Sequence, residues 1–186
     1  MSEILYIGTR LEAYKTLEIF SIHNFNKSVD VLTFEGTLLH THLIKLNNDS
    51  INFKILPNNK KQSLEILNQD LSNNSYKILL SAGFPYLISK KILNSHSTHF
   101  LNIHPHVLPK WKGINAIKES LLENEDTFGA TLHHINEKID DGKIIYKEGF
   151  IFKNKELSNI YSSVFSIIEP FVLLRGLMKD KDLLFK

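Results

Sequence analysis

Apolar residues recur along the chain in short runs, and polar segments rich in turn-forming residues separate these runs. Four runs are typical of strands buried in a sheet, and they span residues 3–7, 29–34, 51–56 and 76–84. Three segments with apolar positions at helical spacing lie between and after them, over residues 11–20, 37–46 and 61–71. Strands that alternate with helices predict an α/β fold with a central, mainly parallel sheet flanked by helices.

The second half of the chain continues this pattern with fewer helices. Further strands are predicted at residues 97–104, 128–135 and 143–152, with helices at 114–122 and 157–178. The apolar stretch from Val164 to Met178 is interrupted by Glu169, Pro170 and Arg175. We therefore expect a buried helix there, which Pro170 can kink, and no membrane span.

Composition limits the classes of protein to consider. The 186 residues, of which 42% are hydrophobic, predict one globular domain over residues 1–186. The absence of cysteine excludes a disulfide scaffold, thiol catalysis and zinc–thiolate sites. A net charge of +2 is too small to indicate a nucleic-acid partner. No secretory signal is visible at the start, so we expect a cytoplasmic protein without a membrane partner.

The strand at residues 97–104 carries candidate chemistry at its end. Alternate side chains of a strand share a face, so Phe100, Asn102 and His104 point the same way. Pro105 ends the strand, which places Asn102 and His104 at its carboxyl end, where open α/β sheets bind ligands. A histidine can transfer a proton near neutral pH, and an asparagine amide can donate to a developing oxyanion. Asp140 could hold the imidazole or a water molecule.

Structural explanations compete with these roles. An asparagine before a proline is often a turn residue, Asp140-Asp141-Gly142 is a common turn sequence, and an isolated histidine is usually structural. Between the first strand and the first helix, Gly8-Thr9-Arg10 could bind an anion with backbone amides and a cation. Neither G-x-G-x-x-G nor a P-loop is present there.

Four segments of the second half follow one another in a recognisable order. They are Asn102-Ile103-His104-Pro105, Leu108-Pro109-Lys110-Trp111-Lys112-Gly113, Gly129-Ala130-Thr131-Leu132-His133 and Asp140-Asp141-Gly142-Lys143-Ile144-Ile145. Taken together, these segments resemble the folate-dependent formyltransferases. The family pattern has N-x-H-P, a basic or aromatic pair before glycine, G-x-T-x-H and D-x-G-x-I in this order. The resemblance implies one Rossmann-like formyltransferase domain in which Asn102, His104 and Asp140 are catalytic. Asp141, in the variable position, is expected to be solvated.

The resemblance also implies binding residues for two substrates. The donor would be 10-formyltetrahydrofolate, with no metal required because the formyl group is already activated. Its pterin ring would contact two loops, formed by Tyr86, Leu87 and Ile88 and by Asn136, Glu137, Lys138 and Ile139. The acceptor, a primary amine, would be near Gly8, Thr9, Arg10, His106 and Lys112. His106 stands where the family usually has serine, and Lys112 where arginine is common in the transfer RNA enzymes.

The sequence leaves the acceptor open. Glycinamide ribonucleotide enzymes have a glycine- and serine-rich phosphate loop after the first strand, whereas this chain has Gly8-Thr9-Arg10-Leu11-Glu12. We therefore expect an amino-deoxysugar nucleotide, with glycinamide ribonucleotide as the alternative. No room is left after residue 178 for the barrel domain of the methionyl-tRNA enzymes, so that substrate is not expected.

Three other functions remain open, as does the oligomeric state. Water could replace the amine, which would make the protein a formyltetrahydrofolate hydrolase. His104, His106, His133 and Asp140 could bind a metal, although His133 and His134 face opposite sides of their strand. The domain could also bind folate without turnover.

Overall fold

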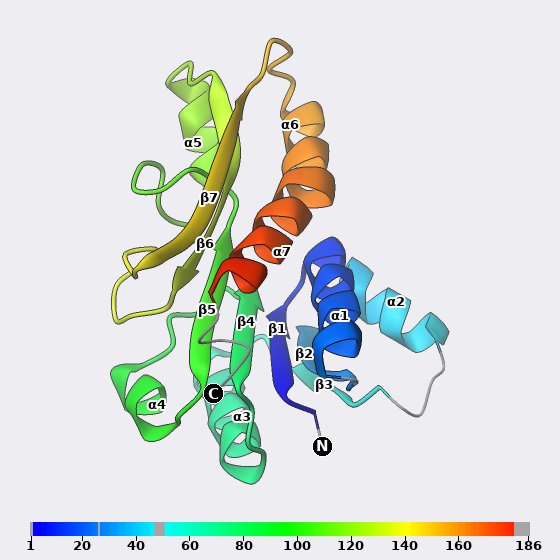
Figure 1. The fold of residues 1–186 in the computed structure, drawn as a ribbon. Coiled ribbons are helices and arrows are strands. Elements are labelled where there is room, and N and C mark those ends of the chain that lie inside the picture. The colour runs from blue at the N-terminus through cyan, green and yellow to red at the C-terminus, as the bar shows by residue number, and fades with distance from the viewer. Residues whose placement is uncertain (1, 26, 47–50, 181–186) are drawn as a thin grey trace. The chain divides into compact units, whose positions relative to one another are not determined.

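The computed structural model describes residues 2–25, 27–46 and 51–180. The chain divides into two compact units, and the boundary falls between Leu101 and Asn102, within strand β5 (His99–His104). The hydrogen-bonded order of the seven strands is β3-β2-β1-β4-β5-β6-β7 (Figure 1). The predicted α/β class with a mainly parallel sheet is confirmed, while the single domain over residues 1–186 stays a prediction.

Parallel strands separated by helices build the first unit. Its strands are β1 (Ile4–Gly8), β2 (Val29–Phe34), β3 (Phe53–Leu56) and β4 (Ile78–Ala82). Its helices are α1 (Leu11–Phe25), α2 (Leu38–Leu46), α3 (Lys60–Asn73) and α4 (Lys90–Ser95). The sequence pattern predicted all of these elements except α4, whose signal is the Ser89 side chain that accepts from Ile92 N at its start.

The strand order of the first unit reverses at β1, which lies between β2 and β4. At its end, Gly8 has a φ of 145°, and a Cβ there would lie 2.0 Å from the carbonyl oxygen of Ala82. Only glycine allows this close approach of the two backbones. The carboxyl ends of β1 and β4 therefore lie side by side, and this is the usual position of a ligand crevice in such sheets.

A buried tyrosine joins three elements of the first unit. The Tyr76 hydroxyl donates to Asp30 Oδ2 at 2.7 Å and to Asp70 Oδ2 at 2.9 Å. Asp30 lies on β2 and Asp70 on α3, where Asp70 is also paired with Lys54 of β3. One hydroxyl hydrogen therefore serves two buried carboxylates.

The second unit is built on antiparallel strands. They are β6 (Thr127–His134) and β7 (Ile144–Ile151), and α5 (Ala116–Leu122) precedes them. Leu132 pairs with Tyr146, but His133 pairs with Ile144, so β7 has one extra residue there. Such a bulge bends the strand. It lies where the loop between β6 and β7 ends.

The C-terminal helical segment differs from the single kinked helix predicted from the sequence. It comprises α6 (Leu157–Ser163), a π-helical turn (Val164–Ile168) and α7 (Glu169–Lys179). Pro170 has no N–H to donate, so the regular hydrogen-bond ladder cannot continue through it, and the wider turn comes just before it. At Gly176, α7 approaches β6 and β7 so closely that a Cβ would lie 2.5 Å from Leu132.

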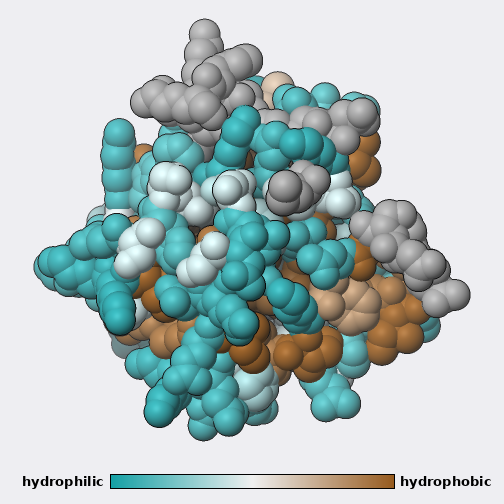
Figure 2. All heavy atoms as spheres, turned by 90° about the horizontal axis from the view of Figure 1, so that it is seen from below, coloured by the Kyte–Doolittle hydropathy of each residue, from teal (hydrophilic) through white to brown (hydrophobic). Residues whose placement is uncertain are grey.

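The segment Leu157–Lys179 is long and apolar enough to cross a membrane by length and composition alone. Only 33% of its most apolar window is buried, so the expectation of a buried helix holds for one side of it. Val172, Leu173 and Leu177 are buried, whereas Phe171 and Met178 are exposed. The face shown in Figure 2 is mostly hydrophilic, with apolar residues in patches between the hydrophilic ones.

Replacing Tyr76 by phenylalanine removes the hydrogen that Asp30 and Asp70 share. We expect the free energy of unfolding in urea to fall by about 1–3 kcal/mol, because Asp30 and Asp70 each lose a hydrogen-bond donor, although Asp70 keeps its pairing with Lys54. Tyr161→Phe is the control, since that ring is half-buried and stacked on Phe165. Equal stability of Tyr76→Phe and the wild type would show that the hydroxyl does not tie these elements together.

Candidate active site

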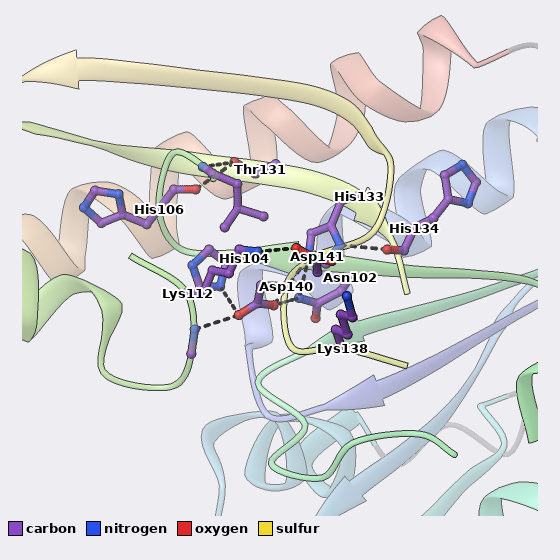
Figure 3. A network of polar contacts seen from close by, with 12 residues as sticks. Asn102, His104, His106, Lys112, Thr131, His133, His134, Lys138, Asp140 and Asp141 are labelled. Atoms are coloured by element: carbon purple, nitrogen blue, oxygen red, sulfur yellow. Dashed lines mark hydrogen bonds and ion pairs between the residues drawn. The ribbon is translucent and has the colours of Figure 1, made fainter. Parts of the chain in front are cut away.

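Three side chains predicted to be catalytic lie together in the second unit. Asn102 and His104 come from the end of β5, and Asp140 comes from the loop between β6 and β7. Asp140 Oδ1 accepts from Asn102 Nδ2 at 3.2 Å, and Asp140 Oδ2 lies 3.2 Å from His104 Nδ1. Figure 3 shows the three side chains turned towards one another. Residues 38 positions apart in sequence thus form one polar network.

His104 is buried and has an acceptor at each ring nitrogen. Its side chain is 3% exposed, with Nδ1 beside the Asp140 carboxylate. Nε2 lies 2.7 Å from the carbonyl oxygen of Trp111, which can only accept a hydrogen bond. Because an ionised carboxylate also only accepts, this arrangement suits the imidazolium form, with a proton on each nitrogen.

Asp140 is held in place by its backbone and by its partners. Its φ of 47° lies in the left-handed region, and its Oδ2 accepts from Gly113 N at 2.8 Å. Burial alone pushes the pKa of Asp140 up, but His133, His104 and the Gly113 N–H together hold it below its ordinary value. The carboxylate is therefore charged at neutral pH.

His133 is a member of this network that the sequence analysis considered only as a metal ligand. Its Nδ1 lies 2.8 Å from the carbonyl oxygen of His134, so a neutral ring has its lone pair on Nε2. That nitrogen lies 3.1 Å from Asn102 Nδ2 and 3.5 Å from Asp140 Oδ1. Protonated, the same nitrogen would become a donor towards the carboxylate. The G-x-T-x-H segment, placed on the neighbouring strand, was the signal that could have identified it.

The amide of Asn102 is oriented by these neighbours. Because Asp140 is ionised, the amide nitrogen and not the oxygen faces it. One Nδ2 hydrogen then points to Asp140 Oδ1, and His133 Nε2 lies 3.1 Å from the same amide nitrogen. Donation to an oxyanion, the role predicted from the sequence, requires that one of these bonds be exchanged.

Side chains of β6 and the β6–β7 loop fix the segment that follows β5. Thr131 Oγ1 donates to the His106 carbonyl oxygen at 2.7 Å and accepts from Leu108 N at 3.0 Å. Thr131 and His133 share one face of β6, because they are two residues apart.

Further along the segment that follows β5, Lys112 is paired with Asp141, and this pairing lowers the pKa of Asp141. Asp141 is exposed. Lys112 was predicted to contact the amine acceptor, and here its ammonium group forms an ion pair with Asp141.

The residues predicted to contact the pterin lie partly in each unit. In the second unit, Asn136 Oδ1 accepts from Lys138 N at 2.9 Å, which forms a turn. Glu137, Lys138 and Ile139 are exposed. In the first unit, Tyr86 is half-buried against Phe84, Leu87 is exposed and Ile88 is buried. Their contact with a pterin stays a prediction.

The predicted anion site at Gly8, Thr9 and Arg10 has fewer available donors than its sequence indicates. Thr9 N donates to the Ala82 carbonyl oxygen at 3.0 Å. Arg10 N donates to the Tyr6 hydroxyl at 3.1 Å. These two backbone amides are therefore engaged within the first unit, and acceptor binding at this turn stays a prediction.

Metal ligation by His104, His106, His133 and Asp140 was one alternative. Over residues 2–25, 27–46 and 51–180, the side chains of His, Asp and Glu form no group of three or more that could hold a metal ion. His106 points away from the other three residues (Figure 3).

His106 is buried in an aromatic environment. Its ring is 2% exposed and lies 6.1 Å from Trp111 and 5.7 Å from Phe128, centroid to centroid. Nδ1 accepts from Val107 N, while Nε2 has no hydrogen-bond partner among the described residues. Burial, together with the charge of His104, lowers the pKa of His106 from 6.5 to about 4. The ring is thus neutral and packed, and its predicted contact with an acceptor stays a prediction.

The lowered pKa of His106 predicts a pH-dependent stability. Between pH 6.5 and about 4 the unfolded chain binds a proton at His106 that the folded chain does not bind, so stability falls as the pH falls. In His106→Leu this contribution, roughly 2–4 kcal/mol across the window, should disappear. Urea unfolding at pH 7, 6, 5 and 4 measures it. Identical pH slopes for the variant and the wild type would contradict the assignment.

Comparisons with known proteins agree on one family. Among curated proteins, methionyl-tRNA formyltransferase of Wigglesworthia glossinidia brevipalpis is 31% identical over 124 residues, which are 67% of this chain and 39% of that protein. The enzyme of the same name from Borreliella afzelii is 28% identical over 175 residues, covering 88% of this chain and 53% of that protein. The chain spans about half the length of these relatives, or less.

Solved structures share the fold at lower identity. Phosphoribosylglycinamide formyltransferase from Bacillus halodurans is 20% identical, with a TM-score of 0.77 over 98% of this chain and 99% of that one. The N-formyltransferase from Helicobacter canadensis, in complex with folinic acid and dTDP-3-aminofucose, is 21% identical, with a TM-score of 0.73 over 96% of this chain and 63% of that one. The formyl transferase family itself matches residues 26–168, well over half of the sequence, and the chain therefore belongs to the formyl transferase family.

Proposed function

We propose that this chain transfers a formyl group from 10-formyltetrahydrofolate to the primary amine of a small acceptor, and that the acceptor is an amino-deoxysugar nucleotide. The observation that supports the reaction is the joining of Asn102, His104 and Asp140 in one buried network. Glycinamide ribonucleotide is the alternative acceptor, and water the alternative nucleophile.

In the proposed reaction the neutral amine attacks the formyl carbon, and the formyl oxygen becomes an oxyanion. The bond between carbon and N10 of the folate then breaks. The amine loses one proton and N10 gains one, so the products are a formamide and tetrahydrofolate. The protein has to stabilise the oxyanion and to transfer the proton.

His104 is the group proposed to stabilise the oxyanion. The imidazolium form has a positive charge and a hydrogen on Nε2, and Asp140 on the other side of the ring favours this form. In the present arrangement Nε2 is bonded to the Trp111 carbonyl oxygen, so the formyl oxygen has to compete for that hydrogen. Asp140 and a water molecule would assist the proton transfer.

Asn102 orients the network in this proposal. Its Nδ2 bonds to His133 and Asp140 leave the carbonyl oxygen of the amide as an acceptor for an amine N–H. If one of those bonds is exchanged, the amide nitrogen can instead donate to the oxyanion. Either role places Asn102 in direct contact with the reacting groups.

The choice of donor and acceptor has separate support. The Helicobacter canadensis N-formyltransferase, which shares the fold, forms a complex with folinic acid and an amino-sugar nucleotide. In this chain, the amides of Thr9 and Arg10 are engaged within the first unit, so they are not available to cradle the phosphate of a ribonucleotide. This observation favours the sugar nucleotide over glycinamide ribonucleotide.

The direct test is to mix the protein with 10-formyltetrahydrofolate and a panel of amines, and to follow both tetrahydrofolate release and acceptor mass. The panel should include several amino-deoxysugar nucleotides, glycinamide ribonucleotide and methionyl-tRNA. We expect one formyl added to a sugar nucleotide. Tetrahydrofolate release with formate and no formylated amine would instead identify a hydrolase.

Two neighbouring aspartates provide a matched pair within this assay. Asp140→Asn removes the charge beside His104 and should lower the transfer rate by about 10²–10³. Asp141→Asn removes only the exposed partner of Lys112 and should change the rate about twofold or less.

His104→Ala should lower the transfer rate by about 10²–10⁴, with folding and folate binding retained. Full transfer by His104→Ala would overturn the assignment.

A further inference from the structure

The first unit contains an open pocket at the carboxyl ends of β2 and β3. The pocket has a volume of about 450 Å³ and is lined by residues 34–36 and 55–58. The two strands are parallel, and Phe34 at the end of β2 pairs with Leu56 at the end of β3. Both strands therefore end at the pocket. This is the edge at which parallel sheets bind ligands, and the volume suits a small organic molecule.

The floor of the pocket is apolar and held by aromatic contacts. The Phe34 ring stacks on Phe84 with centroids 6.1 Å apart and meets Tyr86 edge to face at 6.3 Å. Phe84 and Tyr86 are themselves 5.4 Å apart. Phe34 is only 8% exposed. The rings fix one another, so a ligand would meet a preformed surface.

Two polar side chains at the pocket are available for a ligand. Glu35 and Asn58 line the pocket and are exposed. Neither forms a hydrogen bond or an ion pair within the part of the chain that the structure describes. Gly36 also lines the pocket, with a φ of 75°, and a Cβ there would meet no atom within 4 Å. The pocket thus combines open space at Gly36 with two side chains, Glu35 and Asn58, that can form hydrogen bonds to a ligand.

The chemistry of these groups selects a neutral, hydroxyl-bearing ligand. A carboxylate repels phosphate and carboxylate ligands, and the described residues that line the pocket include no lysine or arginine. Its two oxygens can each accept from one of two adjacent hydroxyls, while an amide can both donate and accept. An apolar floor suits the C–H face of a sugar ring. A carboxylate at the carboxyl end of the second strand is also the group that binds ribose hydroxyls in dinucleotide-binding folds.

We propose that this pocket binds the 2′,3′-diol of a ribose, with Glu35 as the acceptor of both hydroxyls and Asn58 beside it. The site is argued from the first unit alone and does not rest on formyl transfer. A ribonucleoside is the ligand class that follows. A 2′-deoxyribonucleoside presents only one of the two hydroxyls and should bind more weakly.

The test is binding without a formyl donor, followed by 1H–15N NMR on the full chain. Uridine and adenosine are titrated beside their 2′-deoxy counterparts. We expect saturable shifts at the Gly36 amide and around residues 55–58, with the deoxy compounds about tenfold weaker or more. Equal affinity for both sugars, or shifts confined to other residues, would overturn the proposal.

Variants separate the pocket from general effects. Glu35→Gln retains the size of the side chain but removes its charge, and we expect it to weaken ribonucleoside binding by about tenfold. Glu65→Gln, on the exposed side of α3, is the matched control and should bind like the wild type. Binding of free ribose, a neutral sugar, with the same Glu35 dependence would support the ribose site and assign the base no part in it. Unchanged binding by Glu35→Gln would contradict it.

The outcome is independent of the transfer assay. Ribose binding without any formylated product would leave this inference standing and remove the proposed function. Formyl transfer to an amine without ribose-dependent shifts at Gly36 would support the proposed function and overturn the ribose site.

Discussion

The carboxylate of Asp140 is the constraint on which the candidate site depends. One carboxylate oxygen accepts a hydrogen bond from Asn102 Nδ2. The other accepts a hydrogen bond from Gly113 N and lies beside His104 Nδ1. A buried charge is costly unless donors surround it, and here several donors do so. The β6–β7 loop reaches this position through the left-handed backbone of Asp140 and the close passage of Gly142, where a Cβ would lie 1.7 Å from the His134 carbonyl oxygen. The backbone conformation of the β6–β7 loop therefore positions the Asp140 carboxylate, and the hydrogen bonds to that carboxylate hold the loop in place.

Part of this site could be read from the sequence. Alternation along a strand that ends at Pro105 placed Asn102 and His104 on one face, and the D-x-G segment supplied Asp140. The contacts of Trp111 O and Gly113 N could not be read, because every residue has these backbone atoms and only the fold determines where they point. The role of His133 was missed for a related reason, since it depends on which strand lies beside β5.

The fold shows the same division between pattern and context. Buried strands such as β1 and β4 were predicted because continuous apolar runs need shielding on both faces. Helix α4 was missed because six residues carry too little periodicity. The π-helical turn before Pro170 follows from one missing donor, but the sequence alone does not say whether a helix kinks or widens there. His106 was interpreted as a site residue because of its chemistry, although its burial between Trp111 and Phe128 depends on tertiary packing.

We infer that Asp140 favours the imidazolium form of His104, the form proposed to stabilise the oxyanion. Long-range 1H–15N NMR of histidine side chains distinguishes a ring with both nitrogens protonated from either neutral tautomer. At neutral pH we expect both nitrogens of His104 to carry protons in the wild type, and one of them to lose its proton in Asp140→Asn. A neutral His104 ring in the wild type, unchanged by that substitution, would show that Asp140 does not favour the imidazolium form.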